Sequence, residues 1–218
     1  IHYGIAAALQ AISDAGLDEL ESLDKDRVGV NIGSGIGGLP SIEATGKAVI
    51  EGGARKINPF FIPKMILDIA AGQISMKHGF RGPNYAVVSA CASSTNAIIS
   101  AMDNLKLGKA DIVITGGAES VIGVAGMGGF NAMKAMSERN DDPKTASRPY
   151  DKDRDGFVLG EGGGVLILEE YEHAKARGAK IYCEIAGQGL TSDGYHIAAP
   201  DPEGTGVIRA MNMALKDA

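Results

Sequence analysis

The sequence lacks any long apolar run and has few aromatic residues. Its longest apolar stretches, such as residues 85–91 and 165–168, have the length of a strand, whereas a membrane-spanning helix needs about 20 residues. No basic segment precedes an apolar one near the N-terminus, as a secretion signal would require. With 44% hydrophobic residues, the chain can bury a sizeable core as one large domain or two small ones. These features predict a globular, cytoplasmic protein with no membrane partner.

Cysteine and positive charge are also scarce. Cys91 and Cys183 are the only cysteines, too few for a disulfide framework in a chain of this size, which indicates a reducing compartment. Acidic residues outnumber Lys and Arg by 27 to 21, for a net charge of −6. This balance argues weakly against a nucleic-acid partner and leaves room only for local basic patches.

Glycine, in contrast, is abundant. The 31 glycines cluster at the ends of expected strands, which predicts tight turns and close approaches of the backbone. Expected strands alternate with expected helices, as in an α/β protein with a mostly parallel, helix-covered sheet. We expect helices over residues 5–15, 62–78, 91–107 and 171–177, and strands over residues 27–32, 85–90, 112–115, 157–159, 165–169 and 181–187, with the strands at 157–159 and 165–169 paired.

The two ends of the chain resemble each other. The first expected helix ends "QAISDAG" (residues 10–16), and the last residues, "MALKDA" (residues 213–218), repeat its apolar spacing and its Asp-Ala ending. The first residue is Ile, and no strand precedes the first helix. We therefore expect two structural repeats, with the chain beginning and ending inside equivalent helices, as in a fragment of a longer protein.

The stretch "GSGIGG" (residues 33–38) follows an expected strand and matches the dinucleotide-binding pattern G-x-G-x-x-G. That pattern requires a later strand ending in an acid that binds the ribose. Here Glu51 is followed by "GGARKINPFF", which does not have the composition of a strand. We therefore favour glycines that let the backbone pass close to another part of the protein.

Cys91 lies in "VVSACASSTNAI" (residues 87–98), where an apolar run becomes small and polar. A thiolate at a helix N-terminus is favoured by the helix dipole, and small neighbours permit a strained turn that exposes the sulfur. The backbone N–H of Cys91 could then stabilise an oxyanion. On local pattern alone, a buried cysteine that only packs is the commoner case. Cys183, in "IYCEIAG", has only that interpretation, as part of a strand.

Motifs along nearly the whole chain resemble one family, the β-ketoacyl-acyl carrier protein synthases, in particular the elongating type II enzymes of bacterial fatty-acid synthesis. The resemblance implies a thiolase-like layered α/β fold with two similar halves, usually in a homodimer. Residues 1–178 would form most of the N-terminal half and residues 179–218 the beginning of the C-terminal half. The motifs are "SACASSTNA", "GSGIGG", "INPFFIPKMI", "GGAES", "GGFNAMKAMS" and "SRPYDKDRDGFVLGEGGGVLILEEYEHAKARGAKIY".

The resemblance also implies a chemistry. The cysteine at the position of Cys91 takes the acyl chain from acyl carrier protein as a thioester. Malonyl-acyl carrier protein then loses carbon dioxide, and the resulting carbanion attacks the thioester to give a chain two carbons longer. Negative charge develops on a thioester oxygen in each step, so preorganised donors are needed. No metal and no cofactor is implied.

Further residues match positions with known roles in the family. Ile36 matches a residue that lines the acyl pocket, where its bulk limits chain length, and Phe130 matches a phenylalanine that gates entry to the cysteine. Arg55, Lys56 and Lys134 match basic positions that meet the acidic carrier protein. Without the resemblance, Ile36 would be an ordinary loop residue and the three cations ordinary solvated charges.

The sequence departs from the family in its histidines. The family completes its site with two histidines, a lysine and a glycine-rich loop, all from the C-terminal half. None of the four histidines here lies in the His-Gly-Thr context of the family, so we expect all to be non-catalytic and this chain alone not to condense. They are His2, His78, His173 and His196.

Alternatives to a fatty-acid condensing enzyme stay open. A non-catalytic dimerising fragment or chain-length partner would keep the fold without the chemistry, although such partners usually lack the cysteine. Thiolases and polyketide ketosynthases share the cysteine turn. A thiolase would lack the "RPYDKDRDGF" stretch, and a polyketide synthase would normally embed the domain in a much longer chain.

Overall fold

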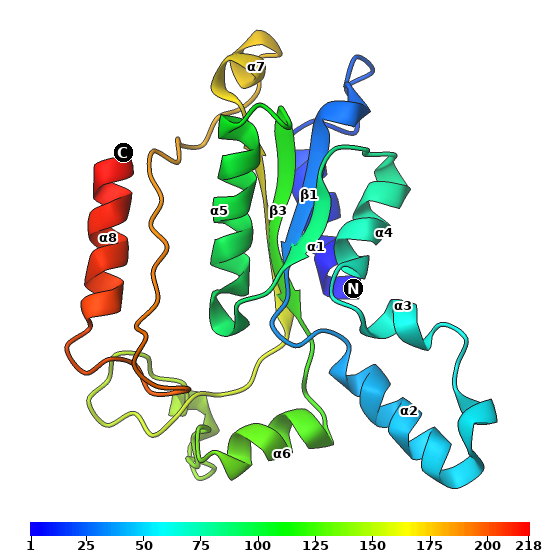
Figure 1. The fold of residues 1–218 in the computed structure, drawn as a ribbon, viewed down its shortest axis with the longest axis vertical. Coiled ribbons are helices and arrows are strands. Elements are labelled where there is room, and N and C mark those ends of the chain that lie inside the picture. The colour runs from blue at the N-terminus through cyan, green and yellow to red at the C-terminus, as the bar shows by residue number, and fades with distance from the viewer. The chain divides into compact units, whose positions relative to one another are not determined.

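The computed structural model describes residues 1–218 and divides into two compact units, Ile1–Glu170 and Tyr171–Ala218 (Figure 1). The larger unit contains a four-stranded sheet covered by helices, whereas the smaller unit contains two helices and no strand. The expected α/β class is therefore confirmed for the larger unit. No helix has both the length and the apolar character needed to cross a membrane.

The sheet has the strand order β2-β1-β3-β4. Strands β1 (Val28–Gly33), β2 (Asn84–Val87) and β3 (Ile112–Glu119) are parallel, and β4 (Gly162–Glu169) runs antiparallel to β3. Parallel strands need long crossover connections, and here these contain helices. The three parallel strands consequently end at the same edge of the sheet.

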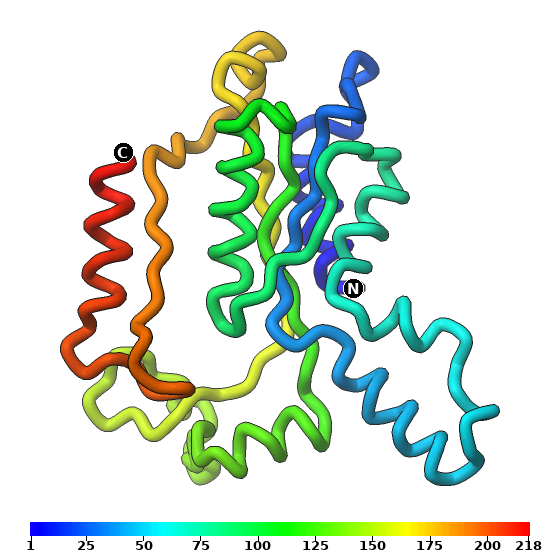
Figure 2. The backbone as a smooth tube through the Cα atoms, viewed as in Figure 1, coloured from blue at the N-terminus to red at the C-terminus, as the bar shows by residue number.

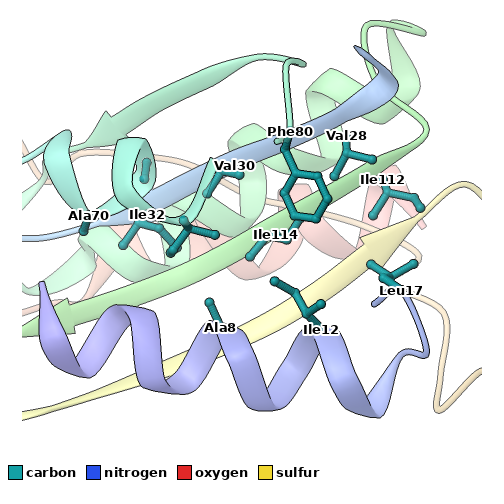
Figure 3. Close-up of a cluster of buried hydrophobic side chains, with 12 residues drawn as sticks. Ala8, Ile12, Leu17, Val28, Val30, Ile32, Ala70, Phe80, Ile112 and Ile114 are labelled. Carbon is teal, nitrogen blue, oxygen red and sulfur yellow. The ribbon is translucent and has the colours of Figure 1, made fainter. Parts of the chain in front are cut away.

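Helices cover both faces of the sheet. Helices α1 (His2–Asp14) and α4 (Ile69–His78) pack on one face, and α5 (Ser93–Lys106) packs on the other. On the first face, Ile12 of α1 belongs with Ile32 and Ile114 to the main cluster of buried side chains (Figure 3). Each such aliphatic side chain contributes about 1.5–3 kcal/mol when it is fully buried, so this cluster holds α1 and α4 to the sheet.

The opposite face is built from small residues, which lets α5 approach the backbone of the sheet closely. Ala97 and Ala101 are fully buried on α5, one turn apart on the same side of the helix. Gly33 of β1 faces α5, where an added Cβ would meet the backbone of Ser93, and it follows the large residue Ile32 of the core face. Helix α5 ends at Lys106 and is capped by Leu107. Gly108 follows with a φ of +64°, a conformation that favours glycine.

Three further helices follow the carboxyl ends of β1 and β3. The tube in Figure 2 leaves β1, runs out through α2 (Leu39–Gly52) and α3 (Phe61–Met65), and returns at α4. Pro40 lies in the first turn of α2, where its missing N–H costs nothing, and Gly53 ends that helix with a φ of +74°. Helix α6 (Val124–Ala132) follows β3.

The smaller unit consists of α7 (Tyr171–Ala176), α8 (Thr205–Asp217) and the irregular segment between them. That segment passes close to α8 at two glycines. A Cβ added to Gly187 would lie 2.2 Å from the carbonyl oxygen of Ala214, and one on Gly189 would lie 1.9 Å from that of Ala210. Only glycine permits these approaches.

The helix expected over residues 62–78 is wrong in one respect, because two helices occupy this region. Ile66 adopts an extended conformation with ψ of 145°, and it separates α3 from α4. The two helices serve different neighbours: α3 packs against α2, while α4 packs against the sheet and α1. Tertiary packing has overridden a continuous apolar pattern.

Two expected strands are also wrong. Residues 157–159 do not pair with residues 165–169; Phe157 forms only an isolated bridge with Met136, and β4 pairs with β3 instead. Residues 181–187 form no strand. A strand requires a neighbour for its hydrogen bonds, and the smaller unit offers this segment only a helix.

Candidate functional site

The turn between β2 and α5 presents Cys91 to solvent. The chain leaves β2 through Ser89, enters a short 3-10 helix at Ala90–Ala92, and continues into α5. Ala90 has a φ of +50°, a left-handed conformation that costs a residue with a Cβ about 1–2 kcal/mol. Cys91 is an exposed free thiol in the 3-10 helix that leads into α5. The strained backbone before it and the exposed sulfur are features that a nucleophile at a strand–helix turn requires, and no core of this chain buries the thiol.

Side-chain hydrogen bonds hold the turn in this conformation. The buried Ser93 hydroxyl accepts a hydrogen bond from the backbone N–H of Ser89 at 2.9 Å and donates one to the carbonyl oxygen of Ala90 at 2.7 Å. The amide Nδ2 of Asn96 donates to the hydroxyl of Ser89 at 2.7 Å. Ser93 and Asn96 therefore stabilise the backbone on both sides of Cys91, a role that the sequence alone did not reveal.

Two glycines at the carboxyl ends of β1 and β3 leave room for the first turn of α5. A Cβ added to Gly33 would lie 2.5 Å from the carbonyl carbon and oxygen of Ser93. One added to Gly117 would lie 1.8 Å from the hydroxyl of Ser94. The close approach expected for the "GSGIGG" stretch is thus present, and the partner is the helix that begins beside Cys91. Helix α2 is followed by a 3-10 helix rather than a strand, so the dinucleotide interpretation has no structural support.

The structure places Ile36 and Phe130 on separate elements beyond the sheet. Ile36 lies at the tip of the loop after β1 and is 38% exposed. Phe130 belongs to α6, where its ring meets that of Phe157 edge-on, with centroids 5.1 Å apart. Gly128 and Gly129 precede Phe130 within α6, and a Cβ added to either would meet open space.

The basic positions Arg55, Lys56 and Lys134 are exposed, and none forms an ion pair. Arg55 and Lys56 lie together in the 3-10 helix after α2. Lys134 follows α6, with a φ of +54°. Their charges are available to an acidic partner, and no contact of this structure joins Lys134 to the other two.

The two histidines of the larger unit do not contribute to the turn of Cys91. His78 ends α4 and stacks on Phe80 with ring centroids 5.3 Å apart. Burial lowers the pKa of His78, and the neighbouring Lys77 adds to the shift. Phe80 leads into β2 at its amino end, whereas Cys91 follows the carboxyl end. His2 is exposed on α1, which packs on the face opposite α5.

The remaining histidines and Cys183 lie in the smaller unit. The Nδ1 atom of His196 accepts hydrogen bonds from the backbone N–H groups of Ala198 and Ala199 at 3.1 and 3.0 Å. His196 therefore stabilises the turn that follows it. His173 lies on α7. The expected buried role of Cys183 is wrong: it is an exposed free thiol, because its segment forms no strand.

Glu119 is the residue at this edge that sequence analysis missed. It is the last residue of β3, and its carboxylate accepts hydrogen bonds from three consecutive N–H groups of the loop that carries Ile36. The motif "GGAES" places an acid at the end of a buried strand, but nothing in the sequence names the loop that it binds. The described residues contain no cluster of His, Cys, Asp and Glu that could hold a metal ion.

These features define a thiolase-like α/β fold with an exposed cysteine at a strained strand–helix turn. The family model described as "Beta-ketoacyl synthase, N-terminal domain" matches residues 1–174. The chain therefore belongs to the β-ketoacyl synthase family.

Curated relatives match along the entire chain. The 3-oxoacyl-[acyl-carrier-protein] synthase 2 of Vibrio cholerae serotype O1 is 52% identical over 218 residues, which are 100% of this chain and 52% of the relative. The mitochondrial 3-oxoacyl-[acyl-carrier-protein] synthase of Arabidopsis thaliana is 46% identical over 217 residues, 99% of this chain and 47% of the relative. The chain thus spans about half the length of the curated relatives it matches.

Solved structures support the same fold. A β-ketoacyl synthase from Burkholderia phymatum STM815 superimposes with a TM-score of 0.90 at 40% identity, covering 99% of this chain and 52% of that one. A ketosynthase of a type II polyketide synthase, solved with its acyl-carrier protein and bound to the hexaketide, gives a TM-score of 0.93 at 32% identity, covering 99% and 54%.

Proposed function

We propose that this chain provides the acyl-accepting part of a 3-oxoacyl-acyl carrier protein synthase of fatty-acid elongation. The observation that carries the proposal is Cys91, exposed at the strained turn between β2 and α5 in a chain of the β-ketoacyl synthase family. Residues 1–178 belong to the N-terminal half of such an enzyme and residues 179–218 to the start of its C-terminal half. The enzyme is a cytoplasmic homodimer, a location that the two free cysteines support.

In the first step, the thiolate of Cys91 attacks the carbonyl carbon of the acyl thioester on the carrier protein. A carbon–sulfur bond forms to Cys91, the bond to the carrier's thiol breaks, and that thiolate leaves and takes up a proton. The oxyanion that develops meanwhile needs donors, and the backbone N–H of Cys91, in the 3-10 helix before α5, supplies one of them. The chain thus supplies the nucleophile and one donor for acyl transfer.

In the second step, malonyl-acyl carrier protein loses carbon dioxide and its carbanion attacks the Cys91 thioester. The resemblance assigns the stabilisation of this carbanion to two histidines and a lysine. Neither histidine of the larger unit takes that place: His78 stacks on Phe80 and His2 lies on the opposite face. We therefore predict acyl transfer without condensation for residues 1–218 alone.

The experiment separates the two steps. The chain is incubated first with acyl-acyl carrier protein, with transfer followed by intact mass, and then with radiolabelled malonyl-acyl carrier protein. Transfer to the wild type and no radiolabelled 3-oxoacyl product are expected. Absence of transfer would overturn the acyl-accepting role, and product formation would overturn the assignment of the second step to residues outside this chain.

Ile36 and Phe130 are proposed to shape access to Cys91. Ile36, at its exposed loop tip, limits the length of the acyl chain, and Phe130 opens and closes the entrance. The hinge beside Phe130 would be Gly128 and Gly129 of α6, because glycine has a freer backbone than other residues.

Arg55, Lys56 and Lys134 are proposed to bind the acidic carrier protein. Reversing two charges with Arg55→Glu and Lys134→Glu should weaken binding of the carrier protein about tenfold at low salt, because these exposed charges steer an acidic partner. The loss should shrink as salt screens the charges. Binding is measured by titration at two ionic strengths.

Lys109→Glu provides the matched control for this prediction. Lys109 is equally exposed but lies in the loop before β3, at the edge of the sheet opposite Cys91. It should leave the affinity within about twofold. Equal losses in the control and the double variant would reduce the effect to net charge and reject the proposed patch.

A polyketide ketosynthase is the second candidate, supported by the similarity to the ketosynthase bound to a hexaketide. The relatives that are about 50% identical to this chain are named 3-oxoacyl-[acyl-carrier-protein] synthase 2, which favours the first candidate. A non-catalytic chain-length partner is disfavoured by Cys91 and its strained turn. Transfer from saturated acyl thioesters, but not from polyketide thioesters, would separate the two catalytic candidates.

A further inference from the structure

The loop after β1 directs its backbone N–H groups at one carboxylate. Gly35 and Ile36 donate to Oε2 of Glu119 at 2.6 and 3.0 Å, and Gly37 donates to Oε1 at 3.2 Å. The hydroxyl of Ser34 donates to Oε1 at 3.0 Å. Successive backbone N–H groups of this kind form an anion-binding concavity. Its anion is here a side chain of the protein itself.

The same loop touches the turn that presents Cys91. A Cβ added to Gly35 would lie 3.1 Å from the carbonyl oxygen of Ala90 and 3.1 Å from Oε2 of Glu119. Gly35 is therefore confined between the carboxylate and the residue that precedes Cys91. The position of Glu119 consequently determines how the loop lies against this turn.

Beyond Ile36 the loop also lies against residues after α2, since a Cβ added to Gly37 would lie 3.0 Å from both Cγ of Leu67 and the carbonyl oxygen of Met65. Ile36 is 38% exposed, and beyond it the N–H of Gly38 donates to the carbonyl oxygen of Met65 at 3.1 Å. The loop is thus anchored at its far end by α3 and along its length by Glu119. Hydrogen bonds to an ionised acceptor are about twice as strong as neutral ones, which makes the carboxylate the main constraint on Ile36.

We propose that Glu119 is a positioning residue that fixes Ile36 relative to the Cys91 turn and thereby sets the length of acyl chain that Cys91 accepts. The inference rests on the proposed function, in which Cys91 takes the acyl group and Ile36 limits its length. Glu119 makes and breaks no bond in the reaction; its carboxylate acts only as a hydrogen-bond acceptor.

Glu119→Gln is the informative substitution because it changes hydrogen bonding with little change in shape. The amide nitrogen cannot accept a hydrogen bond. If it faces the hydroxyl of Ser34, which can accept, the N–H of Gly37 loses its acceptor; the other orientation leaves Gly35 and Ile36 without one. The negative charge is lost in both cases, so the loop is loosened while the fold is kept.

The experiment measures acylation of Cys91 by butyryl- and dodecanoyl-pantetheine, followed by intact mass. In Glu119→Gln the ratio of the dodecanoyl to the butyryl rate should rise about tenfold, the size expected for a lost charge-assisted hydrogen bond. Asp201→Asn is the matched control. Asp201 also accepts from two backbone N–H groups and one hydroxyl, those of Glu203 and Thr205, and none of these bonds involves the loop of Ile36, so the ratio should not change.

A double-variant cycle tests whether Glu119 acts through Ile36. Ile36→Ala alone should raise the same ratio, because it removes the bulk that limits long chains. Adding Glu119→Gln should then change the ratio by less than about twofold, since two residues that act through one contact are not additive.

The outcomes separate the inference from the proposed function. If the wild type is acylated by neither probe, the proposed function fails. If the wild type is acylated, the inference is overturned by equal losses of both rates in Glu119→Gln, by an unchanged ratio, or by additivity with Ile36→Ala. The inference is supported if Glu119→Gln raises the ratio of the dodecanoyl to the butyryl rate in the wild-type background but not in the Ile36→Ala background.

Discussion

At the scale of single residues, the central strands contain polar side chains that lack partners. Thr115 of β3 and Asn31 of β1 are neighbours in register and are both fully buried. Neither the hydroxyl of Thr115 nor the amide of Asn31 has a hydrogen-bond partner. A buried polar group without a partner costs about 1–3 kcal/mol.

Thr115→Val should therefore raise the free energy of unfolding by about 1 kcal/mol, because a methyl group replaces an unsatisfied hydroxyl of similar size. Chemical denaturation measures the change. Thr95→Val, at an exposed position of α5, should stay within about 0.5 kcal/mol of the wild type. A loss of stability in Thr115→Val would mean that the hydroxyl has a partner in solution.

His78 gives stability a pH dependence of known sign. Burial lowers its pKa in the folded state, as does the charge of Lys77, while Asp18 opposes them. The unfolded chain therefore binds more protons, and stability present above about pH 6.5 is lost as the pH falls towards the lower folded pKa. The pKa values of Asp155 and Glu161 are themselves lowered, so these carboxylates stay ionised in this window.

His78→Gln should accordingly reduce the fall in melting temperature between about pH 7.5 and about pH 5.5. Thermal unfolding at the two pH values measures it. His2→Gln, at the exposed start of α1, serves as the control and should keep the wild-type difference. The same difference in His78→Gln as in the wild type would exclude His78 as its source.

The candidate site was partly predictable at this scale. Cys91 and the small residues around it indicated a turn, although only the family resemblance favoured a nucleophile over a packed thiol. Glu119 was not predicted, because its function depends on the loop after β1, which is 82 to 85 residues away in the chain. Hydrogen bonds between distant segments leave no periodic signal in a sequence.

At the scale of elements, some glycines are required because two elements approach each other closely at that position, whereas others have open space around them. Gly117 of β3 faces Ser94 at the start of α5, where an added Cβ would lie 1.8 Å from the hydroxyl. Gly46 lies in the interior of α2, with no atom within 4 Å of an added Cβ.

Gly117→Ala should destabilise the protein by about 3 kcal/mol, because α5 and β3 would have to separate. Gly46→Ala should instead stabilise it by about 1 kcal/mol, since alanine favours a helix interior over glycine. Chemical denaturation of the two variants checks the signs. A loss below about 0.5 kcal/mol in Gly117→Ala would contradict the close packing of α5 on the sheet.

The strands β1 and β3, which are continuous apolar runs buried on both faces, and the helix α5 were found from the sequence. The errors fell where neighbours decide the structure. Residues 62–78 divide because α3 and α4 pack on different elements, and β4 pairs with β3 rather than with the preceding segment. Residues 181–187 have the alternation of a strand but no strand beside them in the smaller unit.

At the scale of the whole molecule, the proposed function depends on the family of the chain and on one exposed thiol, Cys91. The chain belongs to the β-ketoacyl synthase family and spans about half the length of its curated relatives. The larger unit contains the turn of Cys91, the loop of Ile36 and the carboxylate of Glu119. Acyl transfer to Cys91 is therefore the central claim, and the claims about chain length and carrier binding depend on it.

The most direct test is to locate the acyl group after incubation of the chain with dodecanoyl-pantetheine. Proteolysis and peptide mass analysis should find it as a thioester on the peptide containing Cys91, with none on the peptide of Cys183, which is equally exposed but lies in no turn of this kind. Cys91→Ala should abolish the modification and Cys183→Ala should preserve it. Equal labelling of both cysteines, or labelling that persists in Cys91→Ala, would contradict the account.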